Sequence, residues 1–304
     1  MDYFLQNLIN ALQWGSFYAV ISIGYSMVYG ILMLFNFAHG DIFMVGTYIG
    51  FGIATLFLAL FAAIMPGWLI FVFTVVVTMF LAAWVGVFVE VVGYRPLRGA
   101  PRASAAITGL MIGIIFETGN LIILGAKRFS FPSLIESVSY NFGGVYFTNV
   151  KVLIIVVSLI LMLALHTFIK KTKWGMAMRA MSFDFQAVPL MGVSINILAP
   201  LTFAIGAGLA SVAGILYGQA YPVLDPYMGI LLGWKAFVAA ILGGRGSIMG
   251  AALAGYLLGA IEIFVAMVFP STFRDLIAYS IILVILTFRP RGFFGMAHST
   301  QLRL

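Results

Sequence analysis

The stretch Leu69–Val92, LIFVFTVVVTMFLAAWVGVFVEVV, is apolar on every face that a helix would present. A strand of a transmembrane barrel would alternate polar and apolar residues over about ten positions. A helix instead needs about 20 apolar residues to cross a hydrocarbon core about 30 Å thick. The stretch therefore predicts a membrane-spanning helix.

The composition extends this prediction to the whole chain of 304 residues. Hydrophobic residues make up 63% of it and charged residues only 8%, against roughly 25% charged in an ordinary soluble domain. The mean hydropathy of +1.13 excludes a single anchor on a soluble domain, because a soluble remainder would dilute that value. We expect an all-α fold, a polytopic helical bundle formed by one transmembrane domain over residues 1–304.

The apolar runs between breaking residues predict nine passes, within the eight to ten for which the chain has room. They cover residues 7–30, 42–62, 68–92, 104–125, 150–169, 197–220, 229–243, 248–269 and 274–288. The N-terminal stretch MDYFLQNLINALQWGSF has an acid in place of a basic n-region and no small-residue cleavage site. We therefore expect the first membrane helix there rather than a cleaved signal peptide.

The positions of Lys and Arg predict the topology. The first 94 residues contain neither, and the first basic cluster is the short loop 95–102, RPLRGAPR. Short loops rich in Lys and Arg stay in the cytoplasm. Counting passes from this loop places the N-terminus and the stretch 126–149 outside, and the segment 170–196 and the C-terminus inside. Glu90, close to this loop, is expected to be an interfacial residue at a helix end.

Several kinds of chemistry have no signature in the sequence. There is no cysteine, and His39, His166 and His298 are too scattered for a local metal motif. No Gly-Lys pair occurs, so the chain has no phosphate-binding loop, and the serine-elbow and zinc-protease motifs are missing. We expect no catalytic residues, metal or cofactor. The net charge of +7 is explained by topology, so no nucleic-acid partner is expected.

Two polar or Gly-rich breaks interrupt the apolar pattern. The first is NFAHGD at 36–41 and the second is GGRGS at 243–247. Irregular backbone within a membrane is tolerated only against protein or a water-filled cavity, and a pair of such breaks points to a transport path. Each break predicts either a discontinuous helix that lines a path or a tight turn at the membrane interface.

Three ionisable residues, Glu117, Lys235 and Glu262, fall within predicted passes. A gradient-driven transporter would use such groups as an ion relay, whereas structural pairing or snorkelling would make them part of the scaffold.

Small residues are dense at 204–214 and 250–259. Their spacing of three and four favours close helix packing over a substrate surface.

The segment Thr172–Asn196, TKWGMAMRAMSFDFQAVPLMGVSIN, is the most informative stretch outside the predicted passes and lies on the predicted inner face. Its apolar residues, mixed with Arg179 and Asp184, fit short amphipathic helices outside the membrane. Such helices either lie on the lipid headgroups or dock a Met-rich apolar face into a groove of a cytoplasmic partner.

Four blocks carry a family resemblance. Gly15–Gly46 resembles the first helices of LivH-type permeases, the membrane subunits of branched-chain amino-acid ABC importers. Gly175–Gly192 is similar to the G-x-x-x-R-A…D…A…G cytoplasmic segment of that family, and Gly233–Glu262 to its K-A-F…L-G-G-x-G-S…E stretch. Arg289–Gly295 resembles its R-P-x-G-L-F-G ending, with Phe293 where Leu is commoner. The blocks span nearly the whole chain in the expected order.

The resemblance implies partners that the composition does not. Such permeases pair with a second, related permease, bind two cytoplasmic ATPase subunits and receive substrate from a periplasmic or lipid-anchored binding protein. The chain would then lie among lipids in the bacterial cytoplasmic (inner) membrane and pass an amino acid across it. Residues 172–192 would form the coupling helix, with Arg179 and Asp184 in contact with the ATPase. The matched positions of that segment are Gly175, Arg179, Ala180, Asp184, Ala187 and Gly192.

Further matched positions fall on the predicted path. They are Asn36, His39, Gly40 and Asp41 at the first break, Gly243, Gly244, Gly246 and Ser247 at the second, and Lys235 and Glu262 nearby. For Lys235 and Glu262, structural pairing and substrate contact both remain open.

The function expected from the resemblance is import of branched-chain or other hydrophobic amino acids, driven by partner ATPases. The alternatives are an importer of urea, short amides or other amino acids, and a secondary transporter that uses Glu117 or Glu262 as its relay. A membrane-embedded enzyme would need a convergent catalytic set, which the sequence does not offer.

Overall fold

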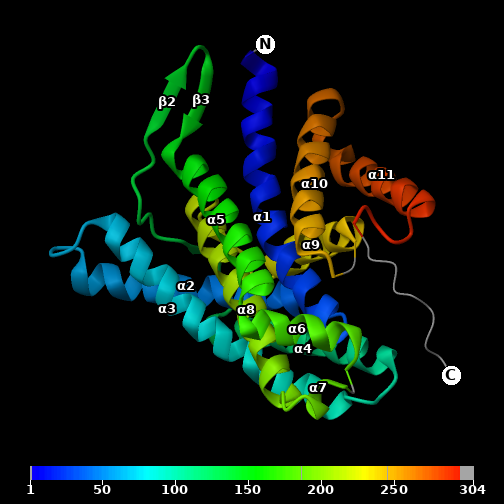
Figure 1. Cartoon of the computed structure of the whole chain (residues 1–304). Coiled ribbons are helices and arrows are strands. Elements are labelled where there is room, and N and C mark those ends of the chain that lie inside the picture. The colour runs from blue at the N-terminus through cyan, green and yellow to red at the C-terminus, as the bar shows by residue number, and fades with distance from the viewer. Residues whose placement is uncertain (1, 186, 245, 295–304) are drawn as a thin grey trace.

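The computed structural model describes residues 2–185, 187–244 and 246–294, and these form a bundle of helices (Figure 1). Arg245, Gly295, His298 and Arg303 lie outside the described residues. The helices are α1 (Asp2–Leu32), α2 (His39–Phe61), α3 (Gly67–Phe88), α4 (Arg102–Leu124), α5 (Asn149–Lys171), α6 (Lys173–Phe183), α7 (Ala187–Leu190), α8 (Ile195–Ala220), α9 (Met228–Gly243), α10 (Ile248–Val268) and α11 (Arg274–Phe288). A π-helical stretch, Val89–Tyr94, and a 3₁₀ turn, Arg95–Leu97, continue α3, and a second 3₁₀ turn, Ser271–Phe273, precedes α11.

The predicted all-α membrane fold is confirmed. In the described part of the chain, eight helices are long and apolar enough to cross a membrane, and the shorter α9 coincides with the seventh predicted pass, 229–243. The largest difference is at α1, which begins at Asp2 instead of residue 7. Asp2, Gln6 and Asn7 interrupt the apolar residues in the first turns of α1, so the apolar pattern alone does not mark where this helix starts.

Helices α1 and α8 form the centre of the bundle. In the most apolar stretch of α1, 83% of the residues are buried. In the corresponding stretch of Ser271–Phe288, which contains α11, only 11% are buried, so α11 faces outward. Close contact between α1 and α10 depends on small residues, because a Cβ atom added to Gly255 would lie 2.6 Å from Cα of Ala19. Likewise, one added to Gly259 would lie 2.6 Å from Cα of Gly15. Part of the small-residue strip at 250–259 therefore packs helix against helix.

Short strands gather at one end of the bundle. β2 (Ser139–Phe142) and β3 (Val145–Thr148) form a hairpin, and β1 (Phe129–Ser130) pairs with β4 (Val223–Leu224). The backbone N–H of Tyr146 donates to Oε1 of Gln6 over 2.8 Å, so the hairpin rests on the N-terminal turns of α1. Figure 1 shows both at the top of the view. We call this the hairpin end.

The opposite end carries α6 and α7, at the bottom of Figure 1, and we call it the α6 end. The basic loop that follows Tyr94 belongs to it, because Arg98 and Met181 line the same cavity. The segments predicted to lie outside thus gather at the hairpin end, and 170–196 gathers with the basic loop at the α6 end. That the α6 end faces the cytoplasm stays a prediction.

Candidate translocation path and coupling surface

The first break lies inside the fold. α1 ends at Leu32, Met33 adopts a positive φ of 56°, and α2 starts at His39. The His39 ring packs against Tyr25, two turns before α1 ends, with 4.6 Å between the ring centroids. Asn36 is 2% exposed and His39 1%. The connection between α1 and α2 therefore turns back into the bundle and buries its polar residues.

Gly40 allows α2 to cross α9 closely. A Cβ atom at Gly40 would lie 2.5 Å from the carbonyl oxygen of Gly229 and 2.8 Å from Cα of Gly233. Reciprocally, a Cβ atom at Gly233 would lie 2.6 Å from Cα of Gly40. The sequence marked Gly40 as a break residue, but its partners on α9 are almost 200 positions away and no local pattern identifies them.

Polar atoms beside the first break lack partners. Oγ of Ser26, Nε2 of His39 and Oδ1 of Asp41 are buried, and none makes a hydrogen bond within the described residues. The carboxyl group of Asp41 also meets that of Glu117 on α4. A buried polar group without a partner costs about 1–3 kcal/mol, so such groups are rare in a purely structural core. Their gathering here fits a hydrated or substrate-contacting region.

The second break rests on the last turns of α1. α9 ends at Gly243, and Gly244 and Gly246 have positive φ values of 105° and 84°, which a glycine adopts without strain. A Cβ atom at Gly30 would lie 2.7 Å from Cα of Gly246. Ser247 caps α10, since its Oγ accepts a hydrogen bond from the backbone N–H of Gly250 over 3.1 Å. The two breaks thus both adjoin the end of α1.

The C-terminal segment completes the second break. The backbone N–H of Phe293 donates to the carbonyl oxygen of Leu242 over 2.9 Å, and that of Phe294 donates to Gly243 over 3.0 Å. The last carbonyl groups of a helix have no partner within it, so these bonds satisfy the end of α9. Gly292, with φ of 74°, packs directly against the backbone of Gly244.

Lys235 and Glu262 belong to a buried charge cluster. Nζ of Lys235 lies 2.9 Å from Oε1 of Glu262 and 2.8 Å from Oδ1 of Asp275, and Arg274 lies within 3.7 Å of both carboxylates. The hydroxyl group of Tyr18 donates to Oε2 of Glu262 over 2.9 Å. The cluster joins α1, α9, α10 and α11, and its two cations balance its two carboxylates. The charges of Lys235 and Glu262 are therefore satisfied within the scaffold.

The face of α6 that points inward holds it against α5. Gly175, Met178 and Met181 are buried, and the backbone N–H of Gly175 donates to Oγ1 of Thr172 over 3.0 Å, which caps the helix. The guanidinium group of Arg179 donates to the carbonyl oxygen of Ile169, near the end of α5. Arg179, predicted to contact a partner, therefore also fixes the junction between α5 and α6.

The outward face of the same segment is apolar and uncovered. Exposed fractions are 62% for Met176, 82% for Phe183, 88% for Leu190 and 81% for Met191. Of the predicted coupling positions, Ala180, Asp184 and Gly192 are exposed as well, while Gly175 is buried and Ala187 begins α7. We call the exposed side chains of 174–191 the coupling surface. Phe183 and Leu190 lie in the amphipathic segment, but no sequence pattern distinguishes them from its other apolar residues.

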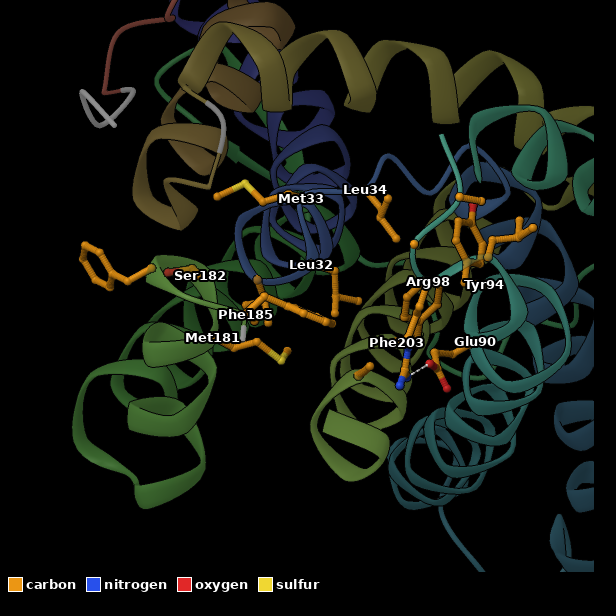
Figure 2. Close-up of a pocket in the computed structure, with 16 residues that line it drawn as sticks. Leu32, Met33, Leu34, Glu90, Tyr94, Arg98, Met181, Ser182, Phe185 and Phe203 are labelled. Atoms are coloured by element: carbon orange, nitrogen blue, oxygen red, sulfur yellow. Dashed lines mark hydrogen bonds and ion pairs between the residues drawn. The ribbon is translucent and has the colours of Figure 1, made fainter. Parts of the chain in front are cut away.

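A cavity of about 400 Å³ separates the coupling segment from the basic loop (Figure 2). Leu32 and Met33 line it from the end of α1, Arg98 from the loop, and Met181 and Phe185 from α6 and the turn after it. In Figure 2 the α6 side and the Arg98 side face each other across this space. The segment 172–192 therefore does not pack directly on the basic loop.

Glu90 is a buried anchor of the basic loop. It lies at the end of α3, as predicted, but it is only 1% exposed and pairs with Arg95 over 3.1 Å and also with Arg98. Arg98 in turn donates to Oδ1 of Asn196 over 2.6 Å, at the start of α8. This role of Glu90 could not be predicted from the sequence, because its partners reach it only through the 3₁₀ turn that folds the loop back.

Comparisons with known proteins agree with the resemblance that the four sequence blocks indicated. Residues 7–286 match the family described as branched-chain amino acid transport system / permease component. The chain is 39% identical over 298 residues to the high-affinity branched-chain amino acid transport system permease protein BraD of Pseudomonas aeruginosa, and 37% identical over 298 residues to LivH of Escherichia coli K12. Both alignments cover 96% of each chain.

A more distant relative is the probable branched-chain amino acid transport permease protein LivH of Methanocaldococcus jannaschii. It is 25% identical over 312 residues, which cover 95% of this chain and 92% of that one. No solved structure matches the chain.

Proposed function

We propose that this chain, which belongs to the family of permease components of branched-chain amino acid transport systems, is the membrane-spanning subunit of an ATP-driven importer. Its cargo would be branched-chain or other hydrophobic amino acids, and BraD and LivH are named for branched-chain amino acid transport. The observation that carries the proposal is the coupling surface, an uncovered apolar face at the α6 end of a bundle built otherwise from helices that can cross a membrane.

Partner proteins would supply what this chain lacks. Its sequence has no phosphate-binding loop, so ATP would be hydrolysed by two cytoplasmic ATPase subunits seated on the coupling surfaces of this chain and of a second, related permease. A periplasmic or lipid-anchored binding protein would deliver the amino acid at the hairpin end. The assembly would stand in a bacterial inner membrane, with the α6 end in the cytoplasm, as the basic loop favours.

The coupling surface has a physical connection to the first break. α6 and α7 lead into α8, whose first turn accepts the hydrogen bond from Arg98. Arg98 pairs with Glu90, and Tyr94, one turn further along the same π-helical stretch, donates to Asn36 over 3.1 Å. Closure of the ATPase pair would switch these linked contacts between two arrangements. ATP hydrolysis can drive transport in this way only if the ATPase binds one arrangement more tightly than the other.

The path itself would pass between the two breaks. The unpartnered groups of His39 and Asp41 would meet water or substrate, and the glycines at 40, 243, 244 and 246 would let the backbone approach closely. Ser247 would hold the start of α10. In this arrangement Lys235 and Glu262 support the path from the charge cluster without binding substrate.

The test is uptake of labelled leucine by proteoliposomes that carry this chain with its partner subunits and binding protein. ATP is supplied inside or withheld, and the ion gradients are either kept or collapsed with ionophores. Uptake that requires ATP and the binding protein, and that persists without a gradient, supports the importer. No ATP-dependent uptake of leucine, isoleucine or valine would contradict it.

A second candidate function is secondary transport, which the meeting of Asp41 and Glu117 favours because two buried carboxyl groups can share a proton. The same proteoliposomes distinguish the two functions. A self-sufficient transporter would take up substrate with this chain alone, on a gradient and without ATP, and Asp41→Asn would abolish that uptake.

A further inference from the structure

A second cavity, of about 410 Å³, opens at the hairpin end. Its walls come from the first turns of α1, the start of α5, the end of α8 and the far end of α10. Its lining includes Gln13, Trp14, Val150, Lys151, Tyr221 and Ile263. Its volume lies within the range of about 300–1,000 Å³ that is usual for small-molecule pockets, and polar side chains form about half of its lining.

Gln13 offers an unused amide to this cavity. Its residue is 4% exposed, and its side chain has no hydrogen-bond partner within the described residues. Gln219, which lines the same cavity, is different: its Oε1 accepts from the backbone N–H of Leu134 and its Nε2 donates to the carbonyl oxygen of Pro132. The Gln13 amide therefore remains available to a ligand or to water in the cavity. The free amide can donate to a carboxylate and accept from an ammonium group.

Lys151 brings a positive charge that no carboxylate of the described structure balances. Its Nζ donates to Oδ1 of Asn10 over 2.7 Å, which uses one of its three protons. It forms no ion pair among the described residues, and no acidic side chain lines the cavity. A partly buried ammonium group in this position favours an anionic ligand group.

Part of the remaining wall is apolar and aromatic, and Asn10, Ser137, Thr148 and Gln219 supply its polar part. The rings of Trp14 and Tyr221 lie 5.1 Å apart, and Val150 and Ile263 add aliphatic surface. Trp14 also separates the cavity from the charge cluster, since the guanidinium group of Arg274 lies 5.8 Å from its ring centroid. The cavity therefore combines a cation, an amide with both donor and acceptor, and an apolar wall.

We propose that this cavity is the receiving site for a free α-amino acid with a branched or other apolar side chain, entered from the hairpin end. The carboxylate binds Lys151 and the amide N–H of Gln13, the ammonium group binds the amide oxygen of Gln13, and the side chain lies against Trp14 and Ile263. This inference rests on the proposed function and adds to it the place where the cargo first binds the membrane subunit.

Photolabelling tests the site directly. The assembled complex in proteoliposomes, without binding protein, is exposed to a diazirine analogue of leucine, irradiated and mapped by mass spectrometry. We expect labelled residues within 10–14, 148–151 and 219–221. Excess leucine should suppress the labelling, whereas leucinamide, which lacks the carboxylate, should not. Labelling confined to other segments, or suppressed equally by leucinamide, overturns the proposal.

Substitutions provide the second measurement. Lys151→Met and Gln13→Leu should each lower ATP-driven leucine uptake about tenfold, the effect of losing one polar contact. Lys151→Arg should retain most uptake, and Lys127→Met, at an exposed lysine outside the cavity, should retain all of it. Copurification with the ATPase and ATP hydrolysis stimulated by the binding protein should stay at the wild-type level in every variant, which excludes a general loss of folding.

The outcomes separate this inference from the proposed function. If the wild-type complex shows no ATP-driven leucine uptake, the proposed function fails. If the wild type takes up leucine but Lys151→Met and Gln13→Leu match it and the cavity is not labelled, only the receiving site fails.

Discussion

The hydroxyl group of Tyr94 lies 3.1 Å from Oδ1 of Asn36, so the π-helical end of α3 is joined to the turn between α1 and α2. Tyr94 is 1% exposed and Asn36 2%, which places this hydrogen bond in the interior. The same short stretch of α3 holds Glu90 and, through it, Arg98 and the start of α8. π-Helical turns are frequent at functional sites, and this one connects the first break to the coupling segment.

Tyr94→Phe should therefore impair coupling more than assembly. The variant keeps the ring but loses a buried hydrogen bond, which contributes about 0.5–1.5 kcal/mol of stability. The lost bond is the one that joins the end of α3 to the first break. We expect leucine uptake per ATP hydrolysed to fall severalfold while the yield of the complex is unchanged. Tyr146→Phe is the matched control, because Tyr146 is 60% exposed at the hairpin end. An unchanged ratio of uptake to hydrolysis in Tyr94→Phe would refute the connection.

Gly40→Ala should destabilise the complex. The added Cβ atom would meet the backbone of Gly229 and Gly233, neither of which can move as a side chain can, and overpacking of this kind costs about 1–3 kcal/mol. The control is Gly52→Ala in the same helix, where a Cβ atom meets nothing within 4 Å. Thermal melting of the detergent-solubilised complex should show a lower Tm for Gly40→Ala only. Equal melting curves would mean that α2 and α9 do not cross so closely.

Phe183→Ser should weaken the hold of the ATPase. Phe183 is 82% exposed on the coupling surface, so its replacement removes apolar contact area from a partner without opening a hole in the fold. Phe142→Ser is the counterpart at the hairpin end, where Phe142 is 81% exposed. We expect copurification of the ATPase to drop for Phe183→Ser and to stay unchanged for Phe142→Ser. The reverse order would place the ATPase at the hairpin end.

A double-mutant cycle at the charge cluster distinguishes scaffold from substrate contact. Lys235→Met and Glu262→Met each leave buried charge without its partner, a situation that costs about 3–5 kcal/mol. If the two residues act through each other, the double variant should recover part of the Tm and of the leucine uptake that each single variant loses. A double variant that regains Tm but no uptake would indicate that one of the two side chains binds substrate.

The helices could be predicted from the sequence because the lipid-facing and packed residues that compose them are continuous in the chain. The position of α9 followed from its apolar run alone, and the breaks followed from polar or glycine residues within such runs. Lys235 and Glu262 also stood out, since a charge within an apolar pass is rare.

The contacts between residues from distant segments could not be predicted from the sequence. Asp275, which completes the charge cluster, lies 40 positions beyond Lys235. Gly229 and Gly233, which pack against Gly40, lie on another helix. The cavity at the hairpin end combines Gln13 with Lys151 because α5 packs on α1. Neither residue is unusual in its local sequence, so only the fold reveals that they face the same space.

The bonds from Phe293 and Phe294 to the end of α9 also set an order of events during biosynthesis. The chain is made from the N-terminus, so α9 enters the membrane with its last carbonyl groups still unpaired. They receive their partners only after α11 has been inserted and the segment behind it has emerged from the ribosome. The second break is therefore among the last parts of the protein to mature, and a chain terminated before residue 292 would keep all its membrane helices but leave the second break unfinished.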